Sequence, residues 1–308
     1  MSKTGVMICG HGSRDEEAVA EFQSLARGMR ERLPQYDVES GFLEFARPTI
    51  QEGLKKLMER GVTDILAAPA ILFAAGHVKN DIPWELNSFA ASHPVLSLSC
   101  GRDLSIEPKL LIAARDRIQA AMETAGGGVA AADTLLMVVG RGTNDPDANS
   151  NVSKVTRMLW EGMDLGWAET CYSGVAHPRV DKGLERVAAM SFRRIIVFPY
   201  FLFTGVLVKR IYAQMAEVAS KYPGTEFVAA SYLNDHPRVL DTLAERVTGI
   251  AEGDNAMNCL LCKYREQVVG FEDAQGQPQA GHHHHVRGIG TGHDHDHAHD
   301  HGPAKEPA

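Results

Sequence analysis

Two histidines and a glutamate stand close to the ends of apolar segments in the first third of the 308-residue chain. His11 lies in the turn "GHGSRD", Glu44 in "FLEFARP" and His77 in "AGHVKND". Two imidazoles and a carboxylate suit a divalent first-row metal, with ligand nitrogens at about 2.0–2.2 Å. A single loop histidine is more often a surface residue, so a metal site is predicted only if the fold brings the three side chains together.

The order of the expected elements brings the two histidines together. Strand-like segments at 5–9, 38–45, 64–73 and 95–100 alternate with helix-like segments, among them 15–32 and 108–124. This alternation predicts a parallel sheet with helices on both sides. Ligands bind beyond the carboxyl ends of such strands, and the first and third strands are neighbours in a doubly wound order. Glu44 joins the histidines only if the strand register turns it inward, because successive side chains alternate between faces.

The chain repeats itself at a constant offset of 130 residues. The matching pairs are Gly10 and Gly140, Gly12 and Gly142, Pro48 and Pro178, Gly53 and Gly183, Pro69 and Pro199, Phe73 and Phe203, Val78 and Val208, and Lys79 and Lys209. Such a repeat predicts an internal duplication. We expect two α/β domains of one fold, at 1–126 and 133–252, facing each other across a cleft. The alternative is two unrelated α/β domains that share turn chemistry.

The second copy lacks all three candidate ligands. Arg141 stands in place of His11, Gly174 in place of Glu44, and Leu207 in place of His77. The glycines and prolines that shape the loops are kept. We therefore expect the three ligands to serve a function that is performed at one site per chain.

Other interpretations of these turns are weaker. The sequence "GHGSRD" is neither GxGxxG nor a phosphate-binding P-loop. A nucleophilic pair of Ser13 and His11 has poor geometry, because two residues in one tight turn leave no oriented acid behind the histidine. His93, His177 and His236 each precede a proline, as turn residues do, and receive no role.

Composition excludes several classes of function. A formal net charge of -8 and the lack of a basic stripe argue against a nucleic-acid partner. No apolar run reaches the roughly 18 residues that span a membrane. An odd number of cysteines, five, without a recognisable signal peptide predicts a cytoplasmic protein rather than a disulfide framework.

Taken together, "GHGSRD", "FLEFARP" and "AGHVKNDIP" resemble the CbiX-type sirohydrochlorin chelatases of the class II chelatase group. Through the duplication the resemblance covers 1–250. It implies a chelatase-like fold and the insertion of Co²⁺ into sirohydrochlorin on the route to cobalamin. His11 and His77 would handle the metal and Glu44 would assist. Neutral imidazoles can hold a metal and then accept pyrrole protons. Because the sequence contains no nucleotide-binding motif, we do not expect the reaction to use ATP.

The substrate implied by the resemblance carries eight carboxylates, which call for fixed cations and polar groups around it. The expected substrate-binding residues are Ser13, Arg14, Lys79, Arg141 and Lys209, all on the relevant loops. Solvated surface charge is the alternative for each of the four cations.

The segment 253–308 is rich in Gly, His and Asp and is predicted to be disordered. Its "MNCLLC" matches the MxCxxC motif of the long form of the family, which implies an iron–sulfur cluster on Cys259 and Cys262. A cluster with four thiolates needs two more, which a homodimer would supply; other ligands remain open.

Nine histidines near the end of the chain are predicted to hold metal loosely, as a reservoir that the chemistry does not need. They are His282, His283, His284, His285, His293, His295, His297, His299 and His301.

Two alternatives for the function stay open. Side-chain types do not separate Co²⁺ from Fe²⁺ or Ni²⁺, so a ferro- or nickelochelatase is the alternative enzyme. A metal storage or chaperone protein is the alternative outside catalysis, although storage would profit from keeping both copies of the site.

Overall fold

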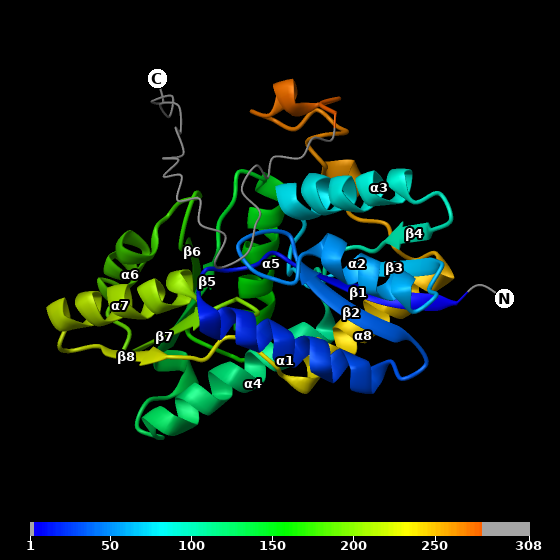
Figure 1. Cartoon of the computed structure of the whole chain (residues 1–308). Helices are drawn as coiled ribbons and strands as arrows, with labels where there is room; N and C mark the ends of the chain where they lie inside the picture. Colours follow the sequence, from blue (N-terminus) through cyan, green and yellow to red (C-terminus); the bar gives the residue numbers. More distant parts are fainter. Residues whose placement is uncertain (1–2, 279–308) are drawn as a thin grey trace.

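The computed structural model describes residues 3–278 and contains two four-stranded parallel sheets, each flanked by helices (Figure 1). This confirms the predicted class of two duplicated α/β domains. The first half contains β1 Thr4–Gly10, α1 Glu16–Arg32, β2 Asp37–Phe42, α2 Ile50–Glu59, β3 Asp64–Pro69, a π-helical turn His77–Asp81, α3 Ile82–Ser92, β4 Ser97–Cys100 and α4 Pro108–Ala125. The second half contains β5 Thr134–Gly140, α5 Pro146–Gly162, β6 Trp167–Tyr172, α6 Val180–Ala188, β7 Arg194–Pro199, α7 Val206–Lys221, β8 Glu226–Ala229 and α8 Pro237–Glu252.

The two sheets have the same topology and the same register. Their strand orders are β2-β1-β3-β4 and β6-β5-β7-β8. Gly10 pairs with Phe42 in the first sheet, and the residues 130 positions later, Gly140 and Tyr172, pair in the second. The central strands are buried on both faces, as expected when helices cover a parallel sheet.

The glycine after each first strand is required by the backbone. Gly12 and Gly142 both have positive φ, at 100° and 78°. A β-carbon on Gly12 would lie 1.7 Å from the carbonyl oxygen of Glu44, and one on Gly142 would lie 1.9 Å from that of Gly174. Only glycine permits this close approach of two loops.

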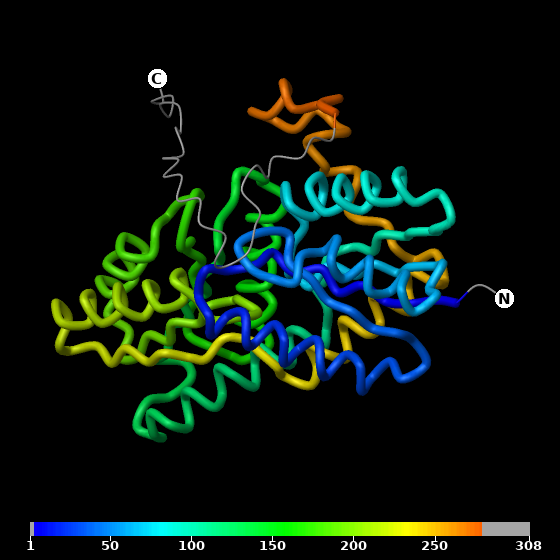
Figure 2. Tube along the Cα trace, in the orientation of Figure 1, coloured from blue at the N-terminus to red at the C-terminus, as the bar shows by residue number. Residues whose placement is uncertain are grey.

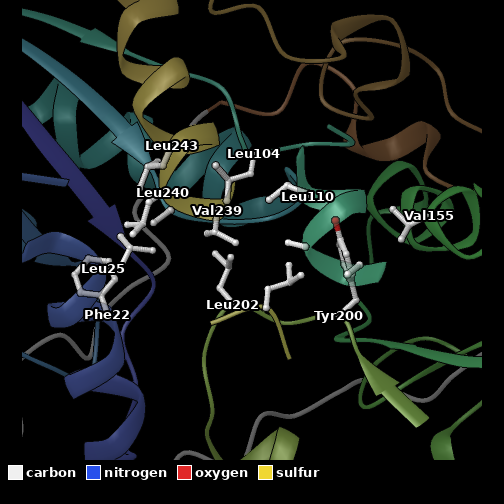
Figure 3. Close-up of a cluster of buried hydrophobic side chains, with 14 of the residues drawn as sticks. Phe22, Leu25, Leu104, Leu110, Val155, Tyr200, Leu202, Val239, Leu240 and Leu243 are labelled. Atoms are coloured by element: carbon white, nitrogen blue, oxygen red, sulfur yellow. The ribbon is translucent and has the colours of Figure 1, made fainter. Parts of the chain in front are cut away.

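The halves exchange their last helices. Helix α8 packs against α1 and β3 of the first half, whereas α4 packs against α5, β7 and β8 of the second. Figure 3 shows the result, with Val239, Leu240 and Leu243 of α8 grouped with Phe22 and Leu25 of α1. One hydrophobic cluster therefore runs through both halves. The predicted domains at 1–126 and 133–252 follow the duplication along the chain, but each packing unit contains the terminal helix of the other.

The tail has a defined course as far as residue 278, although its composition predicts disorder from 253. Its described part contains short 3-10 helices at Cys259–Leu261 and Glu272–Ala274 and lies beside α3 (Figure 2). Asn258 Nδ2 donates to Asp147 Oδ1 at 3.1 Å, and Asn255 Nδ2 donates to the Cys100 carbonyl at 3.2 Å. These contacts to the two halves hold this part of the tail in place.

Within 3–278, no helix combines the length and the apolar character needed to cross a membrane.

Candidate active site

His11, Glu44 and His77 converge as the sequence predicts. His11 Nε2 lies 3.0 Å from His77 Nε2 and 3.2 Å from Glu44 Oε1. One ligand atom from each of the three residues lies within 4.8 Å of the others, and no second such group occurs among the residues that the structure describes. Two imidazole nitrogens and a carboxylate oxygen are thus gathered at a single point, as a first-row metal requires.

The backbone, and not the pleat of a strand, brings Glu44 to this point. The sequence predicts a strand to residue 45, but β2 ends at Phe42. The following loop runs alongside the turn of His11, because Leu43 N donates to the Gly10 carbonyl at 2.8 Å and Glu44 N donates to the His11 carbonyl at 3.0 Å. Glu44 is therefore held next to His11 by main-chain hydrogen bonds.

His77 opens a π-helical turn, which only the first copy contains. The Ile82 N–H donates to the His77 carbonyl, five residues back. The corresponding helix α7 of the second half is regular from Val206 onward, with apolar Leu207 and Ile211 in the places of His77 and Asp81. Single π turns are frequent at functional sites, and here the turn accompanies the candidate ligand.

Hydrogen bonds fix the tautomer of both imidazoles. His11 Nδ1 lies 2.9 Å from the Gly12 carbonyl oxygen, and His77 Nδ1 lies 2.7 Å from Asp81 Oδ2. A carbonyl and a carboxylate only accept, so both Nδ1 atoms carry hydrogen, and in the neutral imidazole Nε2 then presents a lone pair. Two bare nitrogens 3.0 Å apart repel each other, and a cation bound to both removes that repulsion.

Asp81 is a site residue that the sequence reasoning missed. Its side chain is buried, and Asn80 Nδ2 donates to its Oδ1 at 2.6 Å. The available signal was its spacing, because Asp81 follows His77 by one helical turn.

His11 is held in its neutral form. Burial, followed by the neighbouring His77 and Arg141, lowers the pKa of His11 to about 4, although the Gly12 carbonyl and Glu44 act in the opposite direction. A neutral imidazole is the form that binds a metal.

Lys79 is not available to a substrate, which corrects the sequence prediction. Its ammonium lies 2.8 Å from Asp145 Oδ2 and 3.3 Å from Asp147 Oδ2, and only 3% of its side chain is exposed. Lys79 joins the two halves instead, because both carboxylates belong to the start of α5.

Lys209 also pairs with carboxylates, but 51% of its side chain is exposed, so its part in substrate binding stays a prediction. Its Nζ lies 2.8 Å from Asp15 Oδ2 and 2.9 Å from Glu17 Oε2. Ser13 Oγ accepts the Asp15 N–H at 3.0 Å and so shapes the start of α1.

Arg14 and Arg141 remain as candidates. Arg14 is exposed and lies over the ring of Phe45, 5.1 Å from its centroid. Arg141 is also exposed, and its charge acts on both His11 and Glu44. The second copy therefore places a cation beside the metal site at the position where the first copy has a ligand.

Cys259 and Cys262 are both free thiols, the first half-buried and the second buried. Among residues 3–278 they form no three-ligand group with another His, Cys, Asp or Glu side chain, and the histidine site is the only such group. The nine tail histidines, His282 to His301, lie outside the described residues.

The family model for CbiX matches 5–121 and 135–250, one match in each half. The chain belongs to the CbiX family. A CbiX relative named sirohydrochlorin cobaltochelatase, from Priestia megaterium, is 36% identical over 269 residues, which is 87% of each chain. A sirohydrochlorin ferrochelatase of the same organism is 27% identical, over 79% of this chain and 88% of its own. The solved structure of SirB from Bacillus subtilis with Fe³⁺ matches with a TM-score of 0.73 and 26% identity, covering 83% of this chain and all of that one.

Proposed function

We propose that this CbiX-family chain is a sirohydrochlorin chelatase that inserts Co²⁺ into the macrocycle without ATP. The observation that carries the proposal is the convergence of His11 Nε2, His77 Nε2 and Glu44 Oε1 on one point. The match to a relative named sirohydrochlorin cobaltochelatase supports both the substrate and the metal.

The geometry supports a mechanism in which the metal is delivered and protons are collected at one place. The two Nε2 lone pairs and the carboxylate hold the incoming dication, which is a substrate of the reaction. Two pyrrole N–H groups must lose their protons as the metal enters the ring. Glu44 and His77 are the acceptors at the same position, and they regain capacity for protons as the metal leaves them, whereas the lowered pKa of His11 keeps that imidazole neutral.

Arg14 and Arg141 would bind carboxylates at the edge of the macrocycle. Both are exposed, and among residues 3–278 neither makes an ion pair with a carboxylate.

The choice of cobalt is the finer part of the proposal. Iron is the alternative metal, because a relative named sirohydrochlorin ferrochelatase matches as well, at lower identity. A storage protein is the alternative outside catalysis, but only one of the two copies has the ligands.

We also propose two roles for the tail and a location for the protein. Cys259 and Cys262 supply half of a four-thiolate iron–sulfur site, whose other half comes from a second chain in a homodimer. The tail histidines form a metal reservoir. Five free cysteines fit a reducing cytoplasm. Absorbance and EPR after anaerobic purification test the cluster, and a colourless, iron-free protein contradicts it.

The chelatase is tested by mixing protein and sirohydrochlorin anaerobically with Co²⁺, Fe²⁺ or Ni²⁺ and following the visible spectrum. We expect fastest insertion with Co²⁺ and no insertion by the His11→Ala and His77→Ala variants. His93→Gln is the control, since His93 lies at the far end of α3 from His77. Wild-type activity in both alanine variants contradicts the proposal, as does metal binding without any spectral change of the macrocycle.

A further inference from the structure

Three arginines of the second half stand where the first half has uncharged or metal-binding residues. Arg141, Arg179 and Arg210 occupy the positions of His11, Thr49 and Asn80 in the repeat. Within the described part of the chain none of the three pairs with a carboxylate, although most arginines and lysines around them do. At these three positions the second copy therefore carries guanidinium groups in place of a ligand and two uncharged side chains.

The three arginines meet at one loop. This loop, 173–176, takes the place of the loop that carries Glu44. Arg210 Nη2 donates to the carbonyl and hydroxyl oxygens of Ser173, and the Arg141 carbonyl accepts the Gly174 N–H at 2.9 Å. Arg179 Nη1 lies 3.7 Å from the position that a β-carbon would take on Gly174.

This loop belongs to the surroundings of the metal site. Lys209, which precedes Arg210, contacts Asp15 of the His11 turn at 2.8 Å. Lys79, two residues after His77, contacts Asp145 of the Arg141 turn at 2.8 Å. Arg141 and Arg210 are exposed, and Arg179 is partly exposed, so their guanidinium groups are open to a ligand.

Two apolar side chains are exposed beside the arginines. Val175 and Val206 are 55% and 66% exposed. Val175 also has a φ of 56°, which is unfavourable for a β-branched residue. Residues with a strained backbone concentrate at ligand sites. Phe45, the counterpart of Val175, has a φ of 64° and lies against Arg14, so both loops present an apolar side chain next to an arginine.

We propose that Arg179 and Arg210, together with Arg141, bind the peripheral carboxylates of the tetrapyrrole, while Val175 and Val206 contact its flat face. The proposal rests on the proposed chelatase function and names the substrate-recognition residues of that site. Guanidinium groups suit this task because each can hold a carboxylate through two parallel hydrogen bonds. The site fits a planar apolar ring with several carboxylates at its edge.

The experiment measures binding of metal-free tetrapyrroles to the full-length protein by absorbance titration. The probes are sirohydrochlorin, uroporphyrin with eight carboxylates and mesoporphyrin with two. We expect Arg179→Gln and Arg210→Gln each to weaken binding of the first two about tenfold or more, with a small effect on mesoporphyrin. Co²⁺ affinity stays unchanged, and in turnover KM rises while kcat changes little.

Arg157→Gln is the matched control, because Arg157 is an exposed arginine of the second half that pairs with Glu161 instead. If Arg210→Gln fails to fold through loss of its bonds to Ser173, Arg210→Lys retains a donor and the positive charge but not the forked geometry. We expect this variant to fold and to bind the eight-carboxylate probes more weakly.

The outcomes separate the two proposals. If the Arg179 and Arg210 variants bind sirohydrochlorin with wild-type affinity and insert cobalt normally, the proposed recognition role is contradicted. The chelatase proposal is then unaffected. Weaker binding of the polycarboxylates by these variants in a protein that inserts no metal supports the recognition residues and contradicts the chelatase. A loss that is equal for all three tetrapyrroles shows that the arginines only support the loop, and overturns the proposal.

Discussion

The Lys79 ammonium lies 2.8 Å from the Asp145 carboxylate, and the same pair recurs 130 residues away as Lys209 and Asp15, also at 2.8 Å. Each aspartate caps the first helix of its own half, and each lysine reaches it from the other half. The two contacts are related by the duplication, but only one is buried. The tail lies over the buried one, where Asn258 bonds to Asp147.

Replacing Lys79 by methionine should lower the free energy of unfolding by about 3–5 kcal/mol, because Asp145 and Asp147 would remain buried without their cation. Lys209→Met is the matched control and should change stability little, since solvent screens its exposed pair. Denaturant unfolding of both variants measures the difference. Equal losses contradict a special role for the buried contact.

Replacing Asp81 by alanine should weaken Co²⁺ binding about 10–100-fold, because the His77 ring then loses the acceptor that orients it. Asp81→Asn keeps an acceptor oxygen and should lose less. Metal titration gives the affinities, and NMR of ¹⁵N-labelled histidine reports whether the His77 proton leaves Nδ1. Glu21→Gln removes a carboxylate that binds Thr204 and Tyr232 far along the chain and serves as the control. An unchanged tautomer and affinity in Asp81→Ala contradict the positioning role.

We expect the loss of the proton from Asp103 to make the protein less stable as the pH rises from about 4 to about 6. Burial raises the pKa of Asp103 to about 6 from an ordinary value of 3.8, although the Ala74 N–H and Arg246 oppose the shift. The folded state therefore binds more protons than the unfolded state in this window, and stability falls as they are lost. Asp103→Asn should remove this part of the slope, about 2–3 kcal/mol over the window. Unfolding curves at pH 4, 5, 6 and 7 test it, and parallel curves for both proteins would show that the group does not titrate there.

Deleting 280–308 should leave cobalt insertion unchanged at saturating Co²⁺ and slow it when Co²⁺ is limiting, as expected for a reservoir. Initial rates over a range of cobalt concentrations measure the effect. A complete loss of insertion at saturation would show that the segment takes part in the reaction itself.

The parallel sheets and the meeting of His11 with His77 follow from patterns within one half, and the duplication follows from the constant offset between the halves. The sequence displays both directly. The neighbourhood of Lys79 does not follow from such patterns, because its partners Asp145 and Asp147 come from the other half of the chain. The exchange of α4 and α8 escapes prediction for the same reason: an amphipathic helix does not specify which of two similar sheets it covers. Glu44 was predicted on a strand and reaches the site from a loop instead, through main-chain bonds to the His11 turn.

The position of the metal tests the chelatase most directly. Crystals of the full chain soaked in Co²⁺ can be measured on both sides of the cobalt absorption edge, so that the anomalous difference map locates cobalt alone. We predict one strong peak within about 2.0–2.2 Å of both His11 Nε2 and His77 Nε2, next to Glu44. Cobalt bound elsewhere, with this position empty at saturating metal, would contradict the proposed site and the mechanism that depends on it.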